Sequence, residues 1–168
     1  MIKILVIISL LIFLFCIAYW RSPYQIVKHC DGDTSWIKPL IGKQKKIRYA
    51  VIDANESRQA GGKEATEYLY KILPIGSRIS VVITGKKSYD RDLICTVYHG
   101  FTDINLAMLK AGHAMIDPRY LATISPSMQA KYIKAEARAK TKKLGRWKNQ
   151  KSCVVTPWDF RKTSKYSK

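Results

Sequence analysis

Short stretches of alternating apolar and polar residues, separated by turn residues, constrain the fold of this chain most strongly. Five such stretches predict strands, because period-two alternation places one face of each against a core. They lie at residues 24–29, 35–38, 46–52, 79–83 and 93–97. Strands this short, separated mostly by turns, favour a closed or layered β structure over a parallel sheet with a helix after each strand.

Helix signals predict three helices among and after these strands. The first, at about residues 63–73, lies between the third and fourth strands and is followed by Pro74. Asp103 can cap a second helix that ends near Gly112, and Ser125 with Pro126 can start a third that Gly145 stops. We therefore predict an α+β fold that is mainly β, a five-stranded OB-fold barrel with three helices.

Length and charge limit the possible partners. The 168 residues suffice for one domain with a hydrophobic core. Thirty Lys and Arg against twelve Asp and Glu give a net charge of +18. An excess of this size predicts attraction to polyanions, either nucleic acid or an acidic membrane surface. It carries no information about the fold.

The N-terminal segment is apolar behind a single lysine, Lys3. From Ile4 to Trp20 its only polar side chain of note is Ser9, which indicates a signal peptide or a membrane anchor. Cleavage after Ala18 is compatible with the small residues there. We expect residues 1–20 to be this segment, with a possible tether through 4–20, a domain at 24–161 and a basic disordered tail at 162–168. The domain is then extracytoplasmic, and we expect a monomer.

The cysteines do not indicate a zinc site. None of the four forms a Cys-x-x-Cys pair, and the three histidines are scattered. Outside the apolar segment, Cys30, Cys95 and Cys153 can form at most one disulfide. Free thiols are the simpler expectation.

Acidic residues crowd between Asp31 and Glu56, although acids are scarce elsewhere. Asp33 and Asp53 lie in the same stretch, and Arg48 lies between them. Carboxylates and backbone carbonyls are the ligands of hard divalent cations, and an arginine fork suits a phosphate. The alternative is that the Asp-Gly pair at Asp31 is only a turn.

The third strand raises a geometric problem for such a site. Arg48 and Asp53 are five residues apart, so strict alternation would place their side chains on opposite faces. If both serve one site, the strand must bend, bulge or end between them.

These residues occur in the order typical of one family, and the chain resembles the thermonucleases, the staphylococcal-nuclease-like family, over about residues 24–161. Each motif is weak alone, whereas their order and spacing are specific. The motifs are Asp31-Gly32-Asp33-Thr34, Arg48 with Ile52-Asp53-Ala54-Asn55-Glu56, Gly62-Lys63-Glu64-Ala65, Tyr89-Asp90-Arg91, Asn105-Leu106 with Gly112-His113-Ala114, Glu136 and Ala139 with Gly145-Arg146-Trp147, and Pro157-Trp158-Asp159-Phe160-Arg161.

The resemblance implies a calcium-dependent phosphodiesterase that cuts DNA and RNA and leaves 3′-phosphates. It assigns Ca²⁺ to the carboxylates of Asp33 and Asp53 and the backbone carbonyl of Ala54. Asp31 would support the metal through water. Glu56 matches the general base or water-positioning residue.

The same resemblance implies the substrate contacts. Arg48 and Arg91 match the two arginines that grip the scissile phosphate, and Tyr89 and Tyr120 match nucleotide-contacting tyrosines. A cation and two arginines suit a transition state that gathers negative charge on phosphate oxygens.

Three residues depart from the pattern of the family. Asn55 replaces the usual proline before Glu56, Asp90 replaces the usual glycine before Arg91, and Pro118 replaces a substrate-contacting tyrosine of the best-known member. None removes a charged position of the expected site. Two rival hypotheses remain from the sequence, a catalytically silent nucleic-acid-binding OB-fold module and a protein that binds anionic lipid through its basic face.

Overall fold

The computed structural model describes residues 4, 6–10, 23–88 and 91–166. Its centre is a barrel of five strands, in which β3 pairs with β2, β2 with β1, β1 with β5 and β5 with β6. A parallel pairing of β3 with β6 closes the ring, and the other pairings are antiparallel. The strands are β1 (Tyr24–Asp31), β2 (Thr34–Pro39), β3 (Lys45–Tyr49), β5 (Arg78–Ser88) and β6 (Arg91–His99). The predicted α+β barrel of OB-fold type is confirmed.

The predicted third strand is divided in the structure. The chain leaves the barrel after Tyr49, turns through Val51, and forms a separate strand β4 (Ile52–Ala54). This strand pairs antiparallel with β8 (Ala114–Ile116) in a second, two-stranded sheet. A further short strand, β7 (Thr102–Asp103), pairs antiparallel with the end of β6. The expectation of one continuous strand at 46–52 was wrong because alternation does not report a turn whose residues are all apolar.

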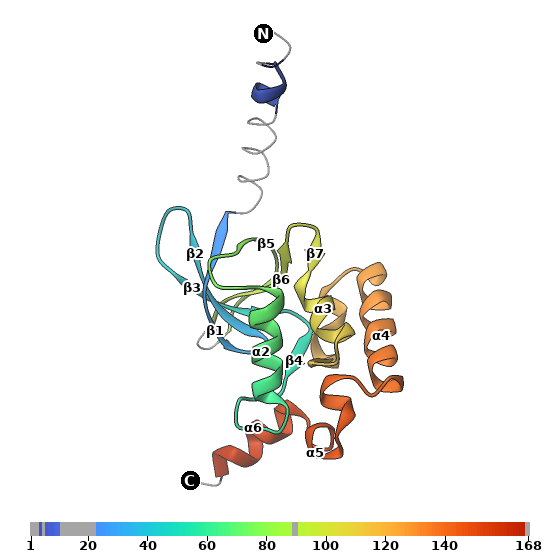
Figure 1. Cartoon of the computed structure of the whole chain (residues 1–168). Helices are drawn as coiled ribbons and strands as arrows, with labels where there is room; N and C mark the ends of the chain where they lie inside the picture. Colours follow the sequence, from blue (N-terminus) through green and yellow to red (C-terminus); the bar gives the residue numbers. More distant parts are fainter. Residues whose placement is uncertain (1–3, 5, 11–22, 89–90, 167–168) are drawn as a thin grey trace.

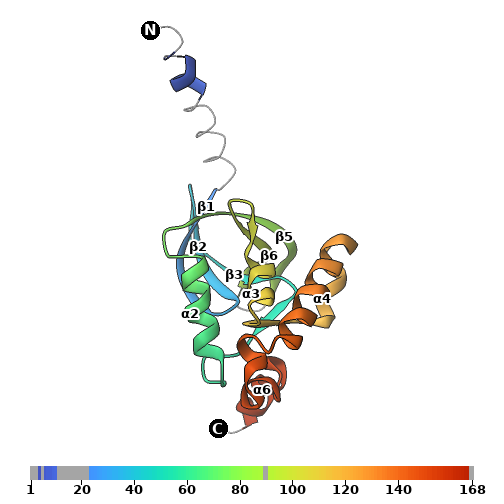
Figure 2. The same cartoon turned by 45° about the vertical axis from the view of Figure 1, so that its right-hand side comes forward.

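The three predicted helices are present with the predicted caps. They are α2 (Gly62–Ile72), α3 (Ile104–Lys110) and α4 (Pro126–Thr141). The side chain of Asp103 accepts from the backbone N–H of Leu106, and that of Ser125 accepts from Met128. In both views α2 lies on one side of the barrel, while α3 and α4 lie together on another (Figures 1 and 2).

The C-terminal part contains elements that sequence reasoning did not anticipate: η1 (Pro118–Thr123), η2 (Gly145–Lys148), α5 (Gln150–Cys153) and α6 (Pro157–Tyr166). Thr156 caps α6, since its hydroxyl accepts from the backbone N–H of Asp159 at 3.2 Å. The tail at 162–168 was expected to be disordered, but α6 continues to Tyr166. Its start has a recognisable signal, a threonine cap followed by proline at the first helical position.

The core fills the barrel and extends under α2. Ile26, Ile37, Ile47 and Ile79 from the strands are buried, as is Leu69 of α2. Each gains on the order of 1.5–3 kcal/mol from leaving water. This packing fixes the strand ends from which the polar residues project.

A buried polar chain crosses this core beside the β1–β2 turn. His29 makes two hydrogen bonds of 2.7 Å, one between Nε2 and the carbonyl of Leu73 and one between Nδ1 and Ser35 Oγ. A carbonyl can only accept, so Nε2 carries the proton and the neutral ring accepts at Nδ1. Ser35 Oγ in turn lies 3.1 Å from the hydroxyl of Tyr49. The chain ties β1, β2, β3 and the end of α2 together.

Two predictions concern parts that the structure describes only partly. Residues 4 and 6–10 are helical, and no helix within the described ranges is long and apolar enough to cross a membrane. Most of the expected signal or anchor, including the cleavage position after Ala18, lies outside those residues.

Among the described cysteines, Cys30, Cys95 and Cys153 are all free thiols.

Candidate active site

The β1–β2 turn places Asp33 at the floor of the candidate site. Its side chain is almost fully buried, with 1% of its surface exposed. Oδ2 accepts from the backbone N–H of Ala54 at 2.6 Å, and Oδ1 accepts from the hydroxyl of Thr34 at 3.0 Å. Asp31 Oδ1 accepts from the backbone N–H of Asp33 at 3.0 Å, which shapes the turn. These bonds aim the Asp33 carboxylate at β4.

Gly32 allows the turn to approach β4 and α2 so closely. A Cβ atom there would lie 2.7 Å from the Cβ of Ala54 and 2.9 Å from that of Ala65. Any side chain would push the turn away from both elements. The Asp-Gly pair is therefore part of the site's construction as well as a turn.

The backbone at Val51 brings Arg48 and Asp53 to the same point. Its φ of 68° is rare for a β-branched residue and ends the barrel strand. Asp117 N–H donates to the Val51 carbonyl at 2.8 Å, which holds the turn. Asp53 can then face Arg48, as the alternation argument required.

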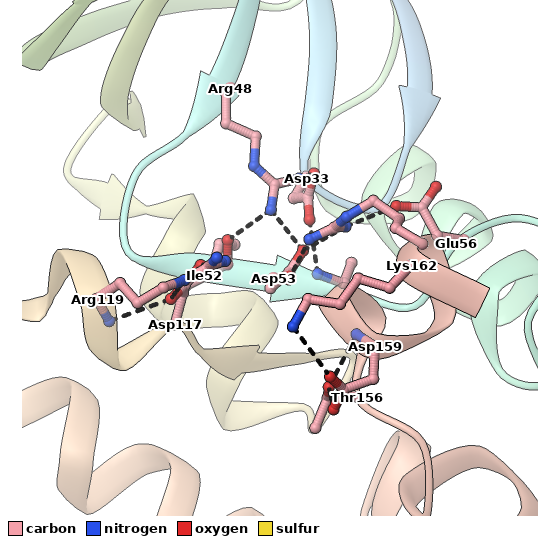
Figure 3. Close-up of polar contacts among 12 residues, drawn as sticks. Asp33, Arg48, Ile52, Asp53, Glu56, Asp117, Arg119, Thr156, Asp159 and Lys162 are labelled. Carbon is pink, nitrogen blue, oxygen red and sulfur yellow. Dashed lines mark hydrogen bonds and ion pairs between the residues drawn. The ribbon is translucent and has the colours of Figure 1, made fainter. Parts of the chain in front are cut away.

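Arg48 joins the two buried aspartates. Its Nη2 donates to Asp53 Oδ1 at 2.5 Å and to the carbonyl of Ile52 at 3.1 Å. Its Nη1 forms an ion pair with Asp33 Oδ1. Figure 3 shows Arg48 pointing toward Asp33 and Asp53, with Glu56 to one side and the Asp117–Arg119 pair to the other. The two carboxylates thus converge on one cation.

Arg161 of α6 is a second arginine in this cluster, and sequence reasoning gave it no role. Its Nη2 donates to Asp53 Oδ2 at 2.7 Å and its Nη1 to Asp53 Oδ1 at 3.1 Å. Nη1 also donates to Glu56 Oε1 at 2.6 Å. The motif around Arg161 was recognised, but nothing local connects it to residues more than a hundred positions earlier. Only the docking of α6 beside β4 does so.

The electrostatics of Asp53 follow from these contacts. Burial acts to raise the pKa of Asp53, but Arg48 and Arg161 outweigh it, so the pKa lies below its ordinary value. For Arg161, burial acts to lower the pKa, while Asp53 and Glu56 raise it beyond the usual arginine value. Both shifts favour the charged forms of Asp53 and Arg161 at neutral pH.

The loop that carries Glu56 is pinned to the C-terminal segment. Asn55 is buried, and its Nδ2 donates to the carbonyls of Ala60 at 2.6 Å and Ser152 at 2.8 Å. Gln59 Nε2 donates to the Val155 carbonyl at 2.7 Å. Asn55 stands where the family that this chain resembles usually has proline. Its two hydrogen bonds hold the loop in place.

A hollow of about 150 Å³ opens beside the acidic cluster. Its lining includes three arginines and two tyrosines: Arg48, Arg119, Arg161, Tyr49 and Tyr120. Asp117 accepts two bonds from the guanidinium of Arg119, at 2.9 Å and 2.6 Å. These bonds raise the pKa of Arg119. Arg119 is a second residue that the sequence did not reveal. So many guanidinium groups around one hollow suit a phosphate.

The predicted site residues fall into two sets. Asp33, Arg48, Asp53 and Glu56 come together, and Asp31 adjoins them through the turn. Ala54 follows Asp53 in β4, and Tyr120 lines the hollow. Tyr89 and the side chain of Arg91 lie outside the described part of the chain.

The donor set fits a hard divalent cation that keeps several waters. Two buried carboxylates, of Asp33 and Asp53, already converge on cationic groups, and oxygen ligands are those that Ca²⁺ and Mg²⁺ select. Within the described residues, no group of three or more His, Cys, Asp or Glu side chains forms a metal cluster. Water and backbone oxygens would therefore supply most ligands.

Comparison with known proteins gives consistent matches. The model of the family described as "Staphylococcal nuclease homologue" matches residues 46–149. An uncharacterized endonuclease of Haemophilus influenzae is 32% identical over 138 residues, which cover 82% of this chain and 73% of that protein. A micrococcal nuclease of Shigella flexneri is 31% identical over 152 residues, covering 84% and 81%. Endonuclease YhcR of Bacillus subtilis is 28% identical over 146 residues, but the match covers only 12% of that protein.

Proposed function

Because the chain belongs to the family of staphylococcal nuclease homologues, we propose that it is a calcium-dependent nuclease. It hydrolyses phosphodiester bonds of DNA and RNA and leaves 3′-phosphates. The observation that carries this proposal is the convergence of Asp33, Asp53 and Glu56 with Arg48 and Arg161 beside an arginine-lined hollow. A module that only bound nucleic acid would gain nothing from carboxylates placed against phosphate.

Two buried carboxylates supply the metal site in this proposal. Asp33 and Asp53 hold the calcium ion, with the carbonyl of Ala54 and, through water, Asp31. When bound, the ion supplies positive charge at the phosphate oxygens. The burial of both aspartates keeps their oxygens fixed, so they need no reorganisation when the substrate arrives.

The arginines bind and orient the phosphate. Arg48 lines the hollow and has a fixed position, since its Nη1 is paired with Asp33 and its Nη2 with Asp53. We assign Arg91 the same role on the basis of its motif. Both would stabilise the negative charge that gathers on the equatorial oxygens as the new bond forms.

Glu56 accepts the proton of the attacking water. About one third of its side-chain surface is exposed, so water can reach the carboxylate. Its contact with Arg161 fixes where Oε1 lies. A positioned carboxylate within reach of the nucleophilic water is the group that general base catalysis requires.

A cleavage assay tests the proposal. Purified protein is incubated with single-stranded DNA, duplex DNA and RNA in calcium, in magnesium and with a calcium-selective chelator. We expect cleavage in calcium, loss of cleavage with the chelator, and products that a polymerase cannot extend until a phosphatase removes their 3′-phosphates. Equal cleavage in magnesium alone would contradict the calcium assignment. Binding without cleavage in any condition would favour the silent binding module.

A further inference from the structure

A basic groove lies between α3 and α4, on elements that do not contribute to the candidate active site. It has a volume of about 550 Å³ and is lined by Leu106, Lys110, Lys131, Lys134, Ala135, Arg138, Lys142 and Leu144. Among the described residues, this lining includes no Asp or Glu. The α3 and α4 helices pack side by side, so the groove is a fixed feature of the fold (Figure 1).

Four cations form a continuous row along α4. Lys131, Lys134 and Arg138 of the helix and Lys142 at its C-cap follow each other at spacings of three or four residues, which places them on one face of the helix. The acid of this helix, Glu136, is engaged elsewhere, with Lys140 and with the backbone N–H of Ile116. The row therefore presents uncompensated positive charge along the groove.

An exposed aromatic ring stands at one end of this groove. A second hollow, of about 430 Å³, shares Leu106, Lys110 and Lys131 with the first and is also lined by Phe101. Phe101 lies in the turn between β6 and β7 and is fully exposed, at 105% of its reference surface. Burial in this fold does not account for a ring in that position.

We propose that this groove is a binding site for single-stranded nucleic acid, separate from the site of cleavage. The row of cations would follow the phosphates, and Phe101 would stack on a base. A charged groove combined with an exposed aromatic ring is the arrangement by which proteins bind single strands without sequence preference. The proposal rests on the proposed function for its biological sense, but binding can be measured without cleavage.

An anionic lipid surface is the rival partner, since one exposed ring beside lysines can also insert into a bilayer. The observations favour nucleic acid, because the cations line a concave groove and the α4 row interleaves with alanine. Membrane-surface helices carry bulky apolar residues opposite their basic face.

Fluorescence anisotropy in chelator tests the groove with a single-stranded and a duplex oligonucleotide. The fourfold variant Lys131→Gln, Lys134→Gln, Arg138→Gln, Lys142→Gln is compared with a control that removes the same charge elsewhere: Lys28→Gln, Lys38→Gln, Lys43→Gln, Lys71→Gln. We expect the groove variant to bind the single strand at least about tenfold more weakly, with a salt slope smaller by about 2–3. The control should bind within about threefold of the parent.

The Phe101→Ala variant separates stacking from general charge. We expect it to weaken single-strand binding by about 5- to 100-fold and to leave duplex binding nearly unchanged. Equal losses in the groove variant and the control overturn the proposal. Binding to vesicles of phosphatidylcholine with phosphatidylserine is measured as well. A groove variant that binds nucleic acid normally but has lost binding to these vesicles also overturns the proposal. If the parent binds single strands in this way but never cleaves them, the proposed function is overturned and the proposed binding site in the groove is retained.

A second inference starts from a separate observation, the engagement of Asp53 by two arginines. Both its oxygens accept N–H groups from Arg161, and Oδ1 also accepts from Arg48. These bonds take three of the about four acceptor positions of the carboxylate. A divalent cation bound at Asp53 would also lie beside two guanidinium charges, and this repulsion favours the departure of one of them. Arg161 is the more displaceable, since one third of its side chain is exposed and it comes from the C-terminal helix, whereas Arg48 is 15% exposed and belongs to the barrel.

We infer that Arg161 is the cation that calcium displaces from Asp53, and that it positions Glu56. The inference rests on the proposed function. Calorimetric titration of calcium without substrate tests it. Arg161→Ala should bind calcium about three- to tenfold more tightly, because no guanidinium must be displaced. Its kcat should fall while KM stays near that of the parent, because Glu56 loses its fixed position.

Lys162 provides the matched control one residue along the same helix. It carries the same charge and, among the described residues, pairs with the exposed Asp159 at 3.8 Å. Lys162→Ala should therefore bind calcium within about twofold of the parent. Arg161→Lys keeps the charge but not the fork, and a smaller gain in affinity is expected. Unchanged or weaker calcium binding by Arg161→Ala overturns the inference. A parent that binds no calcium overturns the calcium assignment as well.

Discussion

At the scale of single residues, the site depends on a few positions that break local rules. Val51 adopts a left-handed conformation, a state that costs about 1–3 kcal/mol and persists only where neighbours hold it. The Asp117 N–H and the Asn105 amide do so, since they donate to the carbonyls of Val51 and Ala50. Asn55 likewise holds the Glu56 loop through its side chain. These residues set where Arg48, Asp53 and Glu56 lie.

Asn55 leads to a prediction about stability. Asn55→Ala removes two hydrogen bonds and leaves the buried carbonyl of Ser152 without this donor. We expect the free energy of unfolding in urea to fall by about 1–3 kcal/mol. Asn149→Ala is the control, because Asn149 is exposed and its Oδ1 accepts one bond, from the N–H of Lys151; its cost should be below about 1 kcal/mol. A larger loss in Asn149→Ala would contradict this account of the loop.

At the scale of secondary structure, the sequence predicts what is local and misses what depends on distant contacts. The five barrel strands and three capped helices follow from alternation and capping residues. A break between Arg48 and Asp53 was expected only if both serve one site, and its place at Val51 was not predicted, because apolar turn residues give no polar signal. The role of Arg161 depends on α6 docking beside β4. Thr156 and Pro157 predict the start of that helix, but no sequence pattern predicts the element against which it packs.

The buried chain through His29 joins these elements and leads to a prediction about pH. Burial lowers the pKa of His29 below its ordinary value of 6.5, outweighing the carbonyl of Leu73 and the charge of Asp31, and burial also lowers that of His113. The unfolded chain then binds more protons than the folded chain below about pH 6.5. Stability should be complete above that pH and fall as the pH drops.

Urea unfolding at about pH 7.5, 6.5 and 5.5 checks this expectation. The double variant His29→Gln, His113→Gln should be less stable than the parent at the highest pH but should lose less stability on acidification. A parent with the same free energy of unfolding at both ends of this range would contradict the account. So would a double variant with the full pH dependence of the parent.

At the scale of the whole molecule, the net charge of +18 includes two groups of cations, the arginines of the site and the row along α4. The arginines of the site are paired with buried carboxylates, and Arg48 is held by two of them. The side chains of the α4 row are exposed and have no acidic partner among the described residues, which suits long-range attraction to a polyanion. A basic protein that cuts nucleic acid must also be kept from the nucleic acid of its own cell.

The N-terminal segment offers a means of doing so, and we propose that the domain lies outside the cytoplasm. The prediction rests on the apolar run from Ile4 to Trp20. Cell fractionation with intact-mass measurement checks it. A mature form that begins near residue 19 would indicate a cleaved signal, and a full-length membrane-bound form would indicate an anchor. A full-length soluble protein in the cytoplasm would contradict the proposal.

The central claim is that the acidic and arginine cluster performs hydrolysis, and Glu56→Gln tests it most directly. This substitution keeps the shape of the side chain and removes its basicity, so it harms the transition state more than the bound substrate. We predict a single-turnover rate lower by a factor on the order of 10² to 10⁴ with unchanged or slightly tighter binding of the same oligonucleotide. Glu67→Gln, which alters an exposed acid of α2 paired with Lys63, should cut at the parental rate. Cleavage by Glu56→Gln at the parental rate would contradict the account.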